Sequence, residues 1–302
     1  MGGLVGGLLA HAGTDVAFVA RGAQLAALRE RGLQIDSPRA TVQLGPIEAA
    51  DDPAQLPPAD VVLVAVKSWQ VAAIAPTLAP LLGPESFVVP LQNGVEAAPR
   101  LARVLGEPRV AGGFCSMLTW LQEPGWITHQ GAILQVVVGE RPAGTSPRLE
   151  PLVAALQTAG IDASMSPDID AALWQKFLFI CTFGAVAAAS RAPARVVRSV
   201  PETRALLVAA MEEVAALGRR RGVNLPEQAV STALAIVDNL PPEATASMQR
   251  DIYAGKPSEL DDQVGAVVRL ATESGIDVPV HRYLLATLLP QEHAARGDGT
   301  RS

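Results

Sequence analysis

Short apolar runs alternate with helical patterns through the first half of the chain. Strands are predicted over residues 16–20 (VAFVA), 61–66 (VVLVAV), 87–91, 110–118 and 133–138. The run VVLVAV is apolar throughout, as expected for a strand that is covered on both faces. Helices are predicted between strands, over residues 22–31 and 70–82. Strands separated by helices indicate a parallel, doubly wound sheet of the α/β class.

The hydrophobic pattern changes near residue 166, and no strand is predicted beyond it. Residues 168–189 are apolar on nearly every side of a helix, and residues 202–221 form an amphipathic helix that ends at Gly222. The other helices are predicted over residues 226–239, 243–255, 259–274 and 279–289. The polar tail after Gln291 is expected to fray.

Length and composition narrow the classes of protein. A chain of 302 residues suits two domains, here a Rossmann-type domain over residues 1–166 and an all-helical domain over residues 167–302. The net charge of -6 argues against nucleic acid or an anionic membrane as the main partner. Cys115 and Cys181 lie far apart in apolar context, which implies no disulfide framework and a reducing compartment. The sequence offers neither a continuous apolar membrane span nor a signal peptide, so we expect a cytoplasmic protein.

Glycines crowd the start of the chain. The opening MGGLVGGLLAHAG precedes the predicted strand VAFVA, as the turn and first helix do in a dinucleotide-binding unit. In such a unit a strand comes first and Gly-x-Gly-x-x-Gly follows, whereas here no strand precedes Gly2. A glycine costs a helix about 1 kcal/mol relative to alanine. Four of them in six residues therefore need a reason such as close helix–sheet packing.

Three polar side chains follow predicted strands. Arg21 comes after VAFVA, where a dinucleotide fold meets the ribose 2′ group, and an arginine there suits the 2′-phosphate of NADP(H). Lys67 and the pair Asn93-Gly94 follow the next two strands, at the edge of an open sheet where ligands bind. Two of them also have an ordinary interpretation: a solvated arginine at position 21 and a plain Asn-Gly turn at 93–94.

Lys176 lies in an apolar helical stretch, between ALWQ and FLFICTF. Its ammonium group must pair, snorkel to water or face a polar cavity. Partial desolvation lowers the pKa of a lysine toward neutrality, which suits a general acid. A lysine that only snorkels from a first helical turn is the alternative.

The segment TASMQRDIYAGKPSELDDQ (245–263) supplies further polar groups. Ser247 and Asp251 are four residues apart and share one face of a predicted helix. KPS (256–258) ends that helix and starts the next, which places Glu259 in a first turn. An acidic residue there is also explained by the helix dipole alone.

Together these features resemble the ketopantoate reductase (2-dehydropantoate 2-reductase) family over almost the whole chain. The motifs that carry the resemblance are the glycine-rich opening, Arg21, VKSWQ (66–70), QNGVE (92–96), ALWQKF (172–177), Ser247-Met248-x-x-Asp251 and Glu259. Any one of them is weak, whereas the ordered set is fairly specific. The resemblance implies that the Rossmann-type domain is followed along the chain by a helical domain like the C-terminal domain of 6-phosphogluconate dehydrogenase.

The resemblance also implies an enzyme that reduces a 2-keto acid with NADPH, namely ketopantoate to (R)-pantoate in pantothenate biosynthesis, without a metal. By similarity, Lys176 is the general acid, and Glu259 orients it and holds the cofactor ribose. Asn93, Lys176 and Ser247 would bind the substrate. The residues implied to bind the cofactor are Gly2, Gly3, Arg21, Lys67, Asn93 and Glu259.

This chain departs from the family pattern at three positions. The pattern has three asparagines that hold polar groups of the substrate, and here they are Ile180, Gly184 and Ala194. Each replacement loses hydrogen-bonding capacity, which points to a less polar 2-keto acid or to another binding mode. The alternatives are a non-catalytic relic or sensor of the same fold and a 3-hydroxyacid or polyol-phosphate dehydrogenase. The apolar surface of the last long helices is compatible with a homodimer.

The family pattern also bears on the start of the chain. Against it, Gly2 aligns with the third glycine of the fingerprint, and Gly3, Gly6 and Gly7 fall on the first helix. The strand before them, of about 5–6 residues, normally lies beside VAFVA and VVLVAV. We expect about ten further residues upstream in the natural protein. Without them the chain should bind NADPH poorly and be marginally stable.

Overall fold

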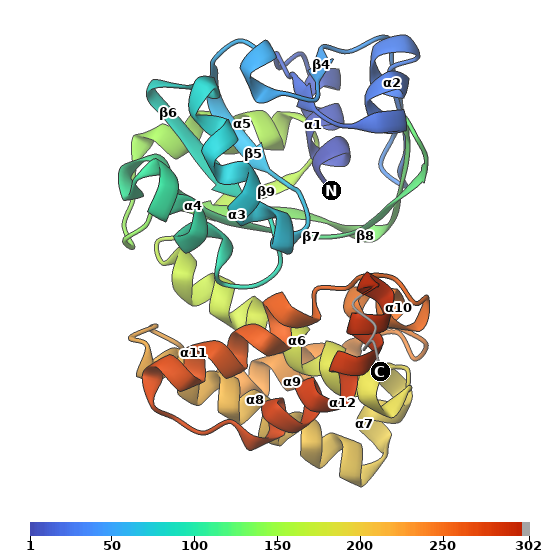
Figure 1. The fold of residues 1–302 in the computed structure, drawn as a ribbon, viewed down its shortest axis with the longest axis vertical. Helices are drawn as coiled ribbons and strands as arrows, with labels where there is room; N and C mark the ends of the chain where they lie inside the picture. The colour runs from blue at the N-terminus through green and yellow to red at the C-terminus, as the bar shows by residue number, and fades with distance from the viewer. Residues whose placement is uncertain (298–302) are drawn as a thin grey trace. The chain divides into compact units, whose positions relative to one another are not determined.

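The computed structural model describes residues 1–297, which form two compact units (Figure 1). The first unit comprises Met1–Gln92 and Ala97–Ile169. The second comprises Asn93–Glu96 and the described residues from Asp170 onward. The segment 93–96 therefore groups with the second unit, although its neighbours in sequence belong to the first. The first unit is a Rossmann-like domain and the second is helical.

Two parallel strand pairs lie in the first unit. β1 (Phe18–Val19) pairs with β4 (Ala49–Ala50), and β5 (Ala59–Val64) pairs with β6 (Leu82–Pro90). Residues 86–90 of β6 are buried, but residues 61–63 of β5 are only half-buried. The expectation that VVLVAV is covered on both faces is therefore wrong in part. β5 has β6 on one side, and no strand of the described chain pairs with its other edge.

Helix α1 (Gly2–His11) packs closely against the ends of both strand pairs. A Cβ atom at Gly2 would lie 2.9 Å from the Ala65 Cβ, just beyond β5. A Cβ atom at Gly6 would lie 2.8 Å from the ring of Phe18 in β1. Real Cβ atoms do not come so close, so a larger residue at either position would push the helix away from these strands.

The next pair of glycines serves a second face of α1. A Cβ atom at Gly3 would collide with the Ile127 side chain, and one at Gly7 would lie 2.6 Å from Leu33 and 2.7 Å from Ile35. These three side chains belong to the larger sheet of the same unit. The prediction that glycines on the first helix permit close helix–sheet packing is confirmed on both faces.

The larger sheet has five strands in the order β3-β2-β8-β7, with β9 also paired to β8. The strands are β2 (Leu33–Asp36), β3 (Thr41–Leu44), β7 (Gly112–Glu123), β8 (Trp126–Gly139) and β9 (Asp162–Met165). β7 and β8 form an antiparallel hairpin, whereas β8 runs parallel to β2 and β9. A parallel arrangement throughout is wrong here, because the short turn at Pro124-Gly125 can join only antiparallel strands.

The single helix expected over 70–82 is broken into three pieces. They are the 3₁₀ turn η2 (Ser68–Gln70), the short helix α3 (Val71–Ile74) and the 3₁₀ segment η3 (Ala75–Leu81). Pro76 and Pro80 cause the break, because a proline lacks the N–H that an α-helix needs. The remaining helices of the unit are α2 (Gly22–Glu30), α4 (Ala97–Leu105) and α5 (Glu150–Thr158), with 3₁₀ turns η1 (Pro53–Gln55), η4 (Glu107–Arg109) and η5 (Pro147–Leu149).

The second unit is built from helices, and its described residues form no strand (Figure 1). The helices are α6 (Ile169–Ser190), α7 (Ala194–Ser199), α8 (Pro201–Arg220), α9 (Ala229–Asn239), α10 (Ser247–Tyr253), α11 (Ala266–Ser274) and α12 (Pro279–Arg296). A π-helical turn, η6 (Asp261–Gly265), leads into α11. α12 continues past Gln291, so the expected fraying is wrong as far as Arg296. The rest of that tail, 298–302, lies outside the described residues.

Helix α6 runs through the core of the second unit. Phe177, Leu178, Cys181 and Val186 have no exposed surface. By length and composition alone α6 is the one helix of the described chain that could cross a membrane, and 72% of its most apolar window is buried inside the protein. The apolar composition therefore has a sufficient explanation in core packing.

Candidate functional site

A chain of hydrogen bonds joins three predicted site residues of the second unit. The Lys176 Nζ donates to the Asn93 Oδ1 at 3.0 Å. The Asn93 Nδ2 in turn donates to the Glu259 Oε2 at 3.1 Å. Asn93 thus lies between an ammonium group and a carboxylate and contacts both through its amide. Sequence separations of 83 and 166 residues are bridged by these two bonds.

Lys176 is held by a buried helix. It lies about two turns inside α6, and its neighbours Phe177 and Trp174 pack edge to face at 5.8 Å between ring centroids. The lysine itself is half-buried. Because the flanking side chains are fixed in the core, the backbone at Lys176 has little freedom. The ammonium group is therefore presented from a rigid element.

Asn93 is fixed by the backbone that follows it. Gly94 has a φ of +98°, a conformation that favours glycine. A Cβ atom at Gly94 would lie 3.1 Å from the carbonyl oxygen of Asp262 in the π-helical turn. Arg269 of α11 then donates to Glu96 at 2.8 Å and to Asp261 at 2.6 Å. The glycine permits a close approach as expected, but to the protein's own backbone.

Glu259 is buried, with 6% of its surface exposed. Its Oε2 accepts from Asn93 and, at 3.4 Å, from the Gln263 Nε2 one turn later. A buried carboxylate needs such partners, because an unpaired charge in a protein interior is costly. A general preference for acids at helix starts does not account for this burial. Gln263 was missed by the sequence reasoning, although its spacing of four residues from Glu259 on one helix was a usable signal.

Ser247 and the three replaced positions lie in the same unit. Ser247 is the exposed first residue of α10. A Cβ atom at Gly184 would lie 3.2 Å from the Met248 Cε and 3.5 Å from the Ala246 Cβ. Ile180 is half-buried, whereas Ala194 is fully buried.

A second carboxylate network, that of the half-buried Glu213, lies at the start of α12. The Glu213 carboxylate accepts from the N–H groups of Val280 and His281 and from the His281 Nδ1 at 2.6 Å. Burial favours the neutral form of Glu213, but these hydrogen bonds outweigh it, so the pKa of Glu213 lies below its ordinary value of 4.5. The ionised carboxylate caps α12 and attaches it to α8.

The predicted cofactor residues Gly2, Gly3, Arg21 and Lys67 all belong to the first unit. Gly2 opens α1 beside Ala65, so the helix N-terminus lies next to the carboxyl end of β5. Helix N-termini present free N–H groups that favour phosphate. A larger residue at Gly2 would push the helix N-terminus away from this strand end.

Arg21 and Lys67 lie at the ends of strands and are exposed. Arg21 is the N-cap of α2, two residues after the end of β1. The Lys67 Nζ lies 5.5 Å from the centroid of the Trp69 ring. The backbone N–H of Lys67 donates to the Gln70 Oε1. Both side chains therefore lie at the surface of the first unit.

Gln92 is a structural residue that the sequence reasoning missed. Only 1% of its surface is exposed, and its Nε2 donates to the carbonyl oxygens of Val64 and Val66 at 2.9 and 3.0 Å. It thereby ties the end of β6 to the end of β5, directly before Lys67. The feature of the sequence that could have indicated this role is a glutamine directly before the Asn-Gly pair.

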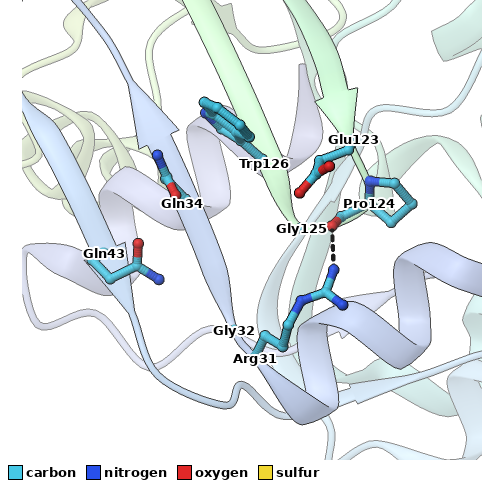
Figure 2. A pocket seen from close by; sticks show the side chains of 8 residues that line it. All are labelled: Arg31, Gly32, Gln34, Gln43, Glu123, Pro124, Gly125 and Trp126. Carbon is cyan, nitrogen blue, oxygen red and sulfur yellow. Dashed lines mark hydrogen bonds between the residues drawn. The ribbon is translucent and has the colours of Figure 1, made fainter.

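The first unit also has an open pocket that contains none of the predicted site residues (Figure 2). Its lining residues are Arg31, Gly32, Gln34, Gln43, Glu123, Pro124, Gly125 and Trp126. The Arg31 guanidinium donates to the Pro124 carbonyl oxygen at 3.0 Å, as Figure 2 shows. The pocket is lined by strand ends and the β7–β8 turn.

Comparisons with known proteins show similarity over most of the chain. The family model for ketopantoate reductase PanE/ApbA matches residues 1–143, and its C-terminal model matches residues 168–292. A 2-dehydropantoate 2-reductase of Mesorhizobium japonicum is 30% identical, with 89% of this chain and 88% of the relative covered. A second from Nostoc sp. is 27% identical, with 92% and 88% covered.

The fold of the chain is also similar to that of a solved structure. The crystal structure of a PanE/ApbA family ketopantoate reductase from Ralstonia eutropha JMP134 has a TM-score of 0.87 and 30% identity, with 97% of this chain and 95% of that chain covered. The two family matches together span most of the chain. The chain therefore belongs to the ketopantoate reductase family of oxidoreductases.

Proposed function

We propose that this protein reduces a 2-keto acid with NADPH, and that 2-dehydropantoate is its substrate, giving (R)-pantoate. The observation that carries the proposal is the hydrogen-bonded series Lys176–Asn93–Glu259. It combines a proton donor, a polar amide and a buried carboxylate within the second unit. The relatives named 2-dehydropantoate 2-reductase support the choice of substrate.

Lys176 is proposed as the general acid. When bound, NADPH supplies a hydride to the carbonyl carbon of the keto acid. Negative charge then develops on the carbonyl oxygen, and a fixed ammonium group stabilises that charge and donates the proton. The neutral amine is left and regains its proton from solvent. Asn93 and Ser247 are proposed to bind the substrate.

Glu259 is proposed to orient Lys176 through Asn93. A carboxylate near an ammonium group favours its charged form, which is the form that can donate a proton. The Asn93 amide passes this influence on, since its two ends contact the two charged groups. A contact from Glu259 or Asn93 to the cofactor ribose is part of the same proposal.

The cofactor proposal is NADP(H), held by the first unit. The N-terminus of α1 at Gly2 and Gly3 would face the dinucleotide phosphates, and Arg21 would pair with the 2′-phosphate. Lys67 would lie beside the cofactor. The support is the position of the α1 start next to the carboxyl end of β5 and the exposure of both cations.

A less polar 2-keto acid is the second candidate substrate. Lys176, Ile180 and Gly184 follow one another at four-residue intervals and share a face of α6. The nearest neighbours of the Gly184 Cβ position are Met248 and Ala246, both apolar, and the Gln263 Oε1 follows at 3.9 Å. Fewer hydrogen-bonding side chains on this face leave less to gain from a substrate hydroxyl, so the replacements favour an alkyl or aryl keto acid.

The experiment is NADPH oxidation with a panel of 2-keto acids, followed at 340 nm (from the absorbance of reduced nicotinamide). The panel contains ketopantoate, its analogue without the hydroxyl group, and an aryl keto acid, each repeated with NADH. Turnover fastest on ketopantoate with NADPH supports the first candidate, and a preference for the analogue or the aryl acid supports the second. NADPH binding without turnover on any keto acid would contradict both and favour a non-catalytic sensor.

A further inference from the structure

Ser258, the residue before Glu259, is hydrogen-bonded to α12 through its N–H, its hydroxyl group and its carbonyl oxygen. Its N–H and its hydroxyl both donate to the Glu292 carboxylate, at 3.0 Å and 2.5 Å. Its carbonyl oxygen accepts from Arg296 at 3.0 Å. Ser258 has no exposed surface. The peptide bond that leads into Glu259 is therefore fixed from both sides.

Burial of the Glu292 carboxylate at this position has a free-energy cost. Only 3% of its surface is exposed, and a buried carboxylate is costly unless it is paired and hydrogen-bonded. Arg296, one helical turn later, neutralises it at 2.6 Å. An apolar contact would attach α12 as well or better, since buried ion pairs are weak sources of stability. What a buried ion pair provides instead is a fixed orientation of the groups that it contacts.

The Glu292–Arg296 pair and its bonds to Ser258 set the position of the neighbouring Glu259. The Ser258 hydroxyl also accepts from the N–H of Leu260 at 3.2 Å, which sets the first turn of the following helix. Glu259 lies between these two anchored residues, and its side chain must reach the Asn93 amide at 3.1 Å. A small rotation of this turn would move the carboxylate away from Asn93.

We propose that Glu292 is a positioning residue for the reaction: through Ser258 it aims the Glu259 carboxylate at Asn93 and so at Lys176. The inference rests on the proposed function. Glu292 is 34 residues from Ser258 in sequence and touches none of the proposed substrate-binding groups in the described contacts. Its effect passes through the Ser258 backbone.

The test compares Glu292→Gln with Glu213→Gln in the full chain. Both variants remove a hydrogen-bonded carboxylate charge that anchors α12, at opposite ends of the helix; Glu292 is buried and Glu213 is half-buried. A glutamine at 292 offers one acceptor and an amide nitrogen that repels Arg296, so the Ser258 turn loses its anchor. Displacing a group near the reacting atoms by about 1 Å can cost 100-fold. We expect kcat to fall by about 10- to 100-fold in Glu292→Gln and to stay near the wild-type value in Glu213→Gln.

Two further readouts separate positioning from general destabilisation. The alkaline limb of the kcat–pH profile should move to lower pH in Glu292→Gln alone, because the ammonium group loses support from an aligned carboxylate. Hydrogen exchange should accelerate over 256–266 in Glu292→Gln and over 278–284 in Glu213→Gln. Ser258→Ala, which keeps the Glu292–Arg296 pair, should show a smaller version of the same kcat loss if Glu292→Gln does not fold.

The outcomes are distinct. Equal kcat values in the two glutamine variants, or a kcat loss without a shift of the pH profile, would overturn the positioning role. Unchanged exchange over 256–266 in Glu292→Gln would overturn it even if wild-type protein reduced no keto acid. Failure of the proposed function is therefore recognised separately, by absence of wild-type turnover.

Discussion

Asn93 is the residue through which the candidate site is connected. Its amide accepts from the Lys176 ammonium group with one atom and donates to the Glu259 carboxylate with the other. A carboxylate could not make both contacts, because it offers no donor to Glu259, whereas an amide offers one acceptor atom and one donor atom. The asparagine therefore keeps the two charged groups at fixed positions on either side of itself.

Replacing Asn93 with alanine should lower kcat by at least about tenfold, because the general acid loses its orienting partner. Steady-state kinetics on the best keto acid of the panel would measure this. Asn239→Ala is the matched control, since that amide on α9 donates to a carbonyl of its own helix. A kcat for Asn93→Ala within about twofold of the control would contradict the role of the bridge.

The Glu213 carboxylate makes stability depend on pH in a specific way. Its pKa is lowered in the folded protein, so its contribution is present above about pH 4.5 and is lost as the pH falls through the lowered folded value. The stability difference between wild type and Glu213→Gln should therefore be constant near neutral pH and shrink below about pH 4.5. Urea denaturation between about pH 7 and 3 measures it. A difference that grows on acidification would contradict the assignment.

At the residue level, the sequence singled out three side chains that the structure links by hydrogen bonds, but it did not indicate how they are connected. Lys176 is conspicuous because a cation interrupts an apolar stretch, and Asn93 because it follows a strand. The link from Lys176 to Glu259 through one amide could not be predicted, since it depends on the exact positions of groups 83 and 166 residues apart. The Ser258–Glu292 anchor was missed for the same reason.

At the level of elements, helix α1 shows how composition serves packing. Its glycines at positions 2 and 6 face the two parallel strand pairs, and those at positions 3 and 7 face the larger sheet. The spacing of four residues within each pair puts both members on one face of the helix. The glycines lower helix propensity, and the close approach on two faces compensates for that cost.

Gly7→Leu should destabilise the first unit by about 1–3 kcal/mol, because the new side chain must displace Leu33 and Ile35. Thermal and urea unfolding would measure the change. Gly45→Ala is the control, since its backbone does not need a positive φ and open space surrounds its Cβ position. That substitution should be neutral or stabilising by a few tenths of a kcal/mol. Equal stability of both variants would contradict the packing role of α1.

Element type followed from hydrophobic pattern wherever the pattern was long. Helices α6, α8 and α9 lie within a few residues of their predicted bounds. The pattern failed over residues 70–82, where two prolines override an apolar periodicity, and over the β7–β8 hairpin, where a two-residue turn decides the strand direction. Short strands such as β3 and β9 carry too few residues for any period to be recognised.

At the level of the whole molecule, the two units have separate roles in the proposed reaction. The groups proposed for the cofactor, Gly2, Gly3, Arg21 and Lys67, belong to the first unit, and Lys176, Glu259 and Ser247 belong to the second. The segment 93–96 groups with the second unit through the Arg269 bonds and Gly94. Changes to the proton donor should therefore leave cofactor binding intact.

The most direct test of the account is the turnover of Lys176→Ala with NADPH and the best keto acid of the panel, alongside NADPH binding followed by fluorescence. The account predicts a kcat lower by about 10²- to 10⁴-fold, the usual contribution of a general acid, with NADPH affinity unchanged. A kcat close to that of the wild type would contradict the assignment of Lys176 as the proton donor.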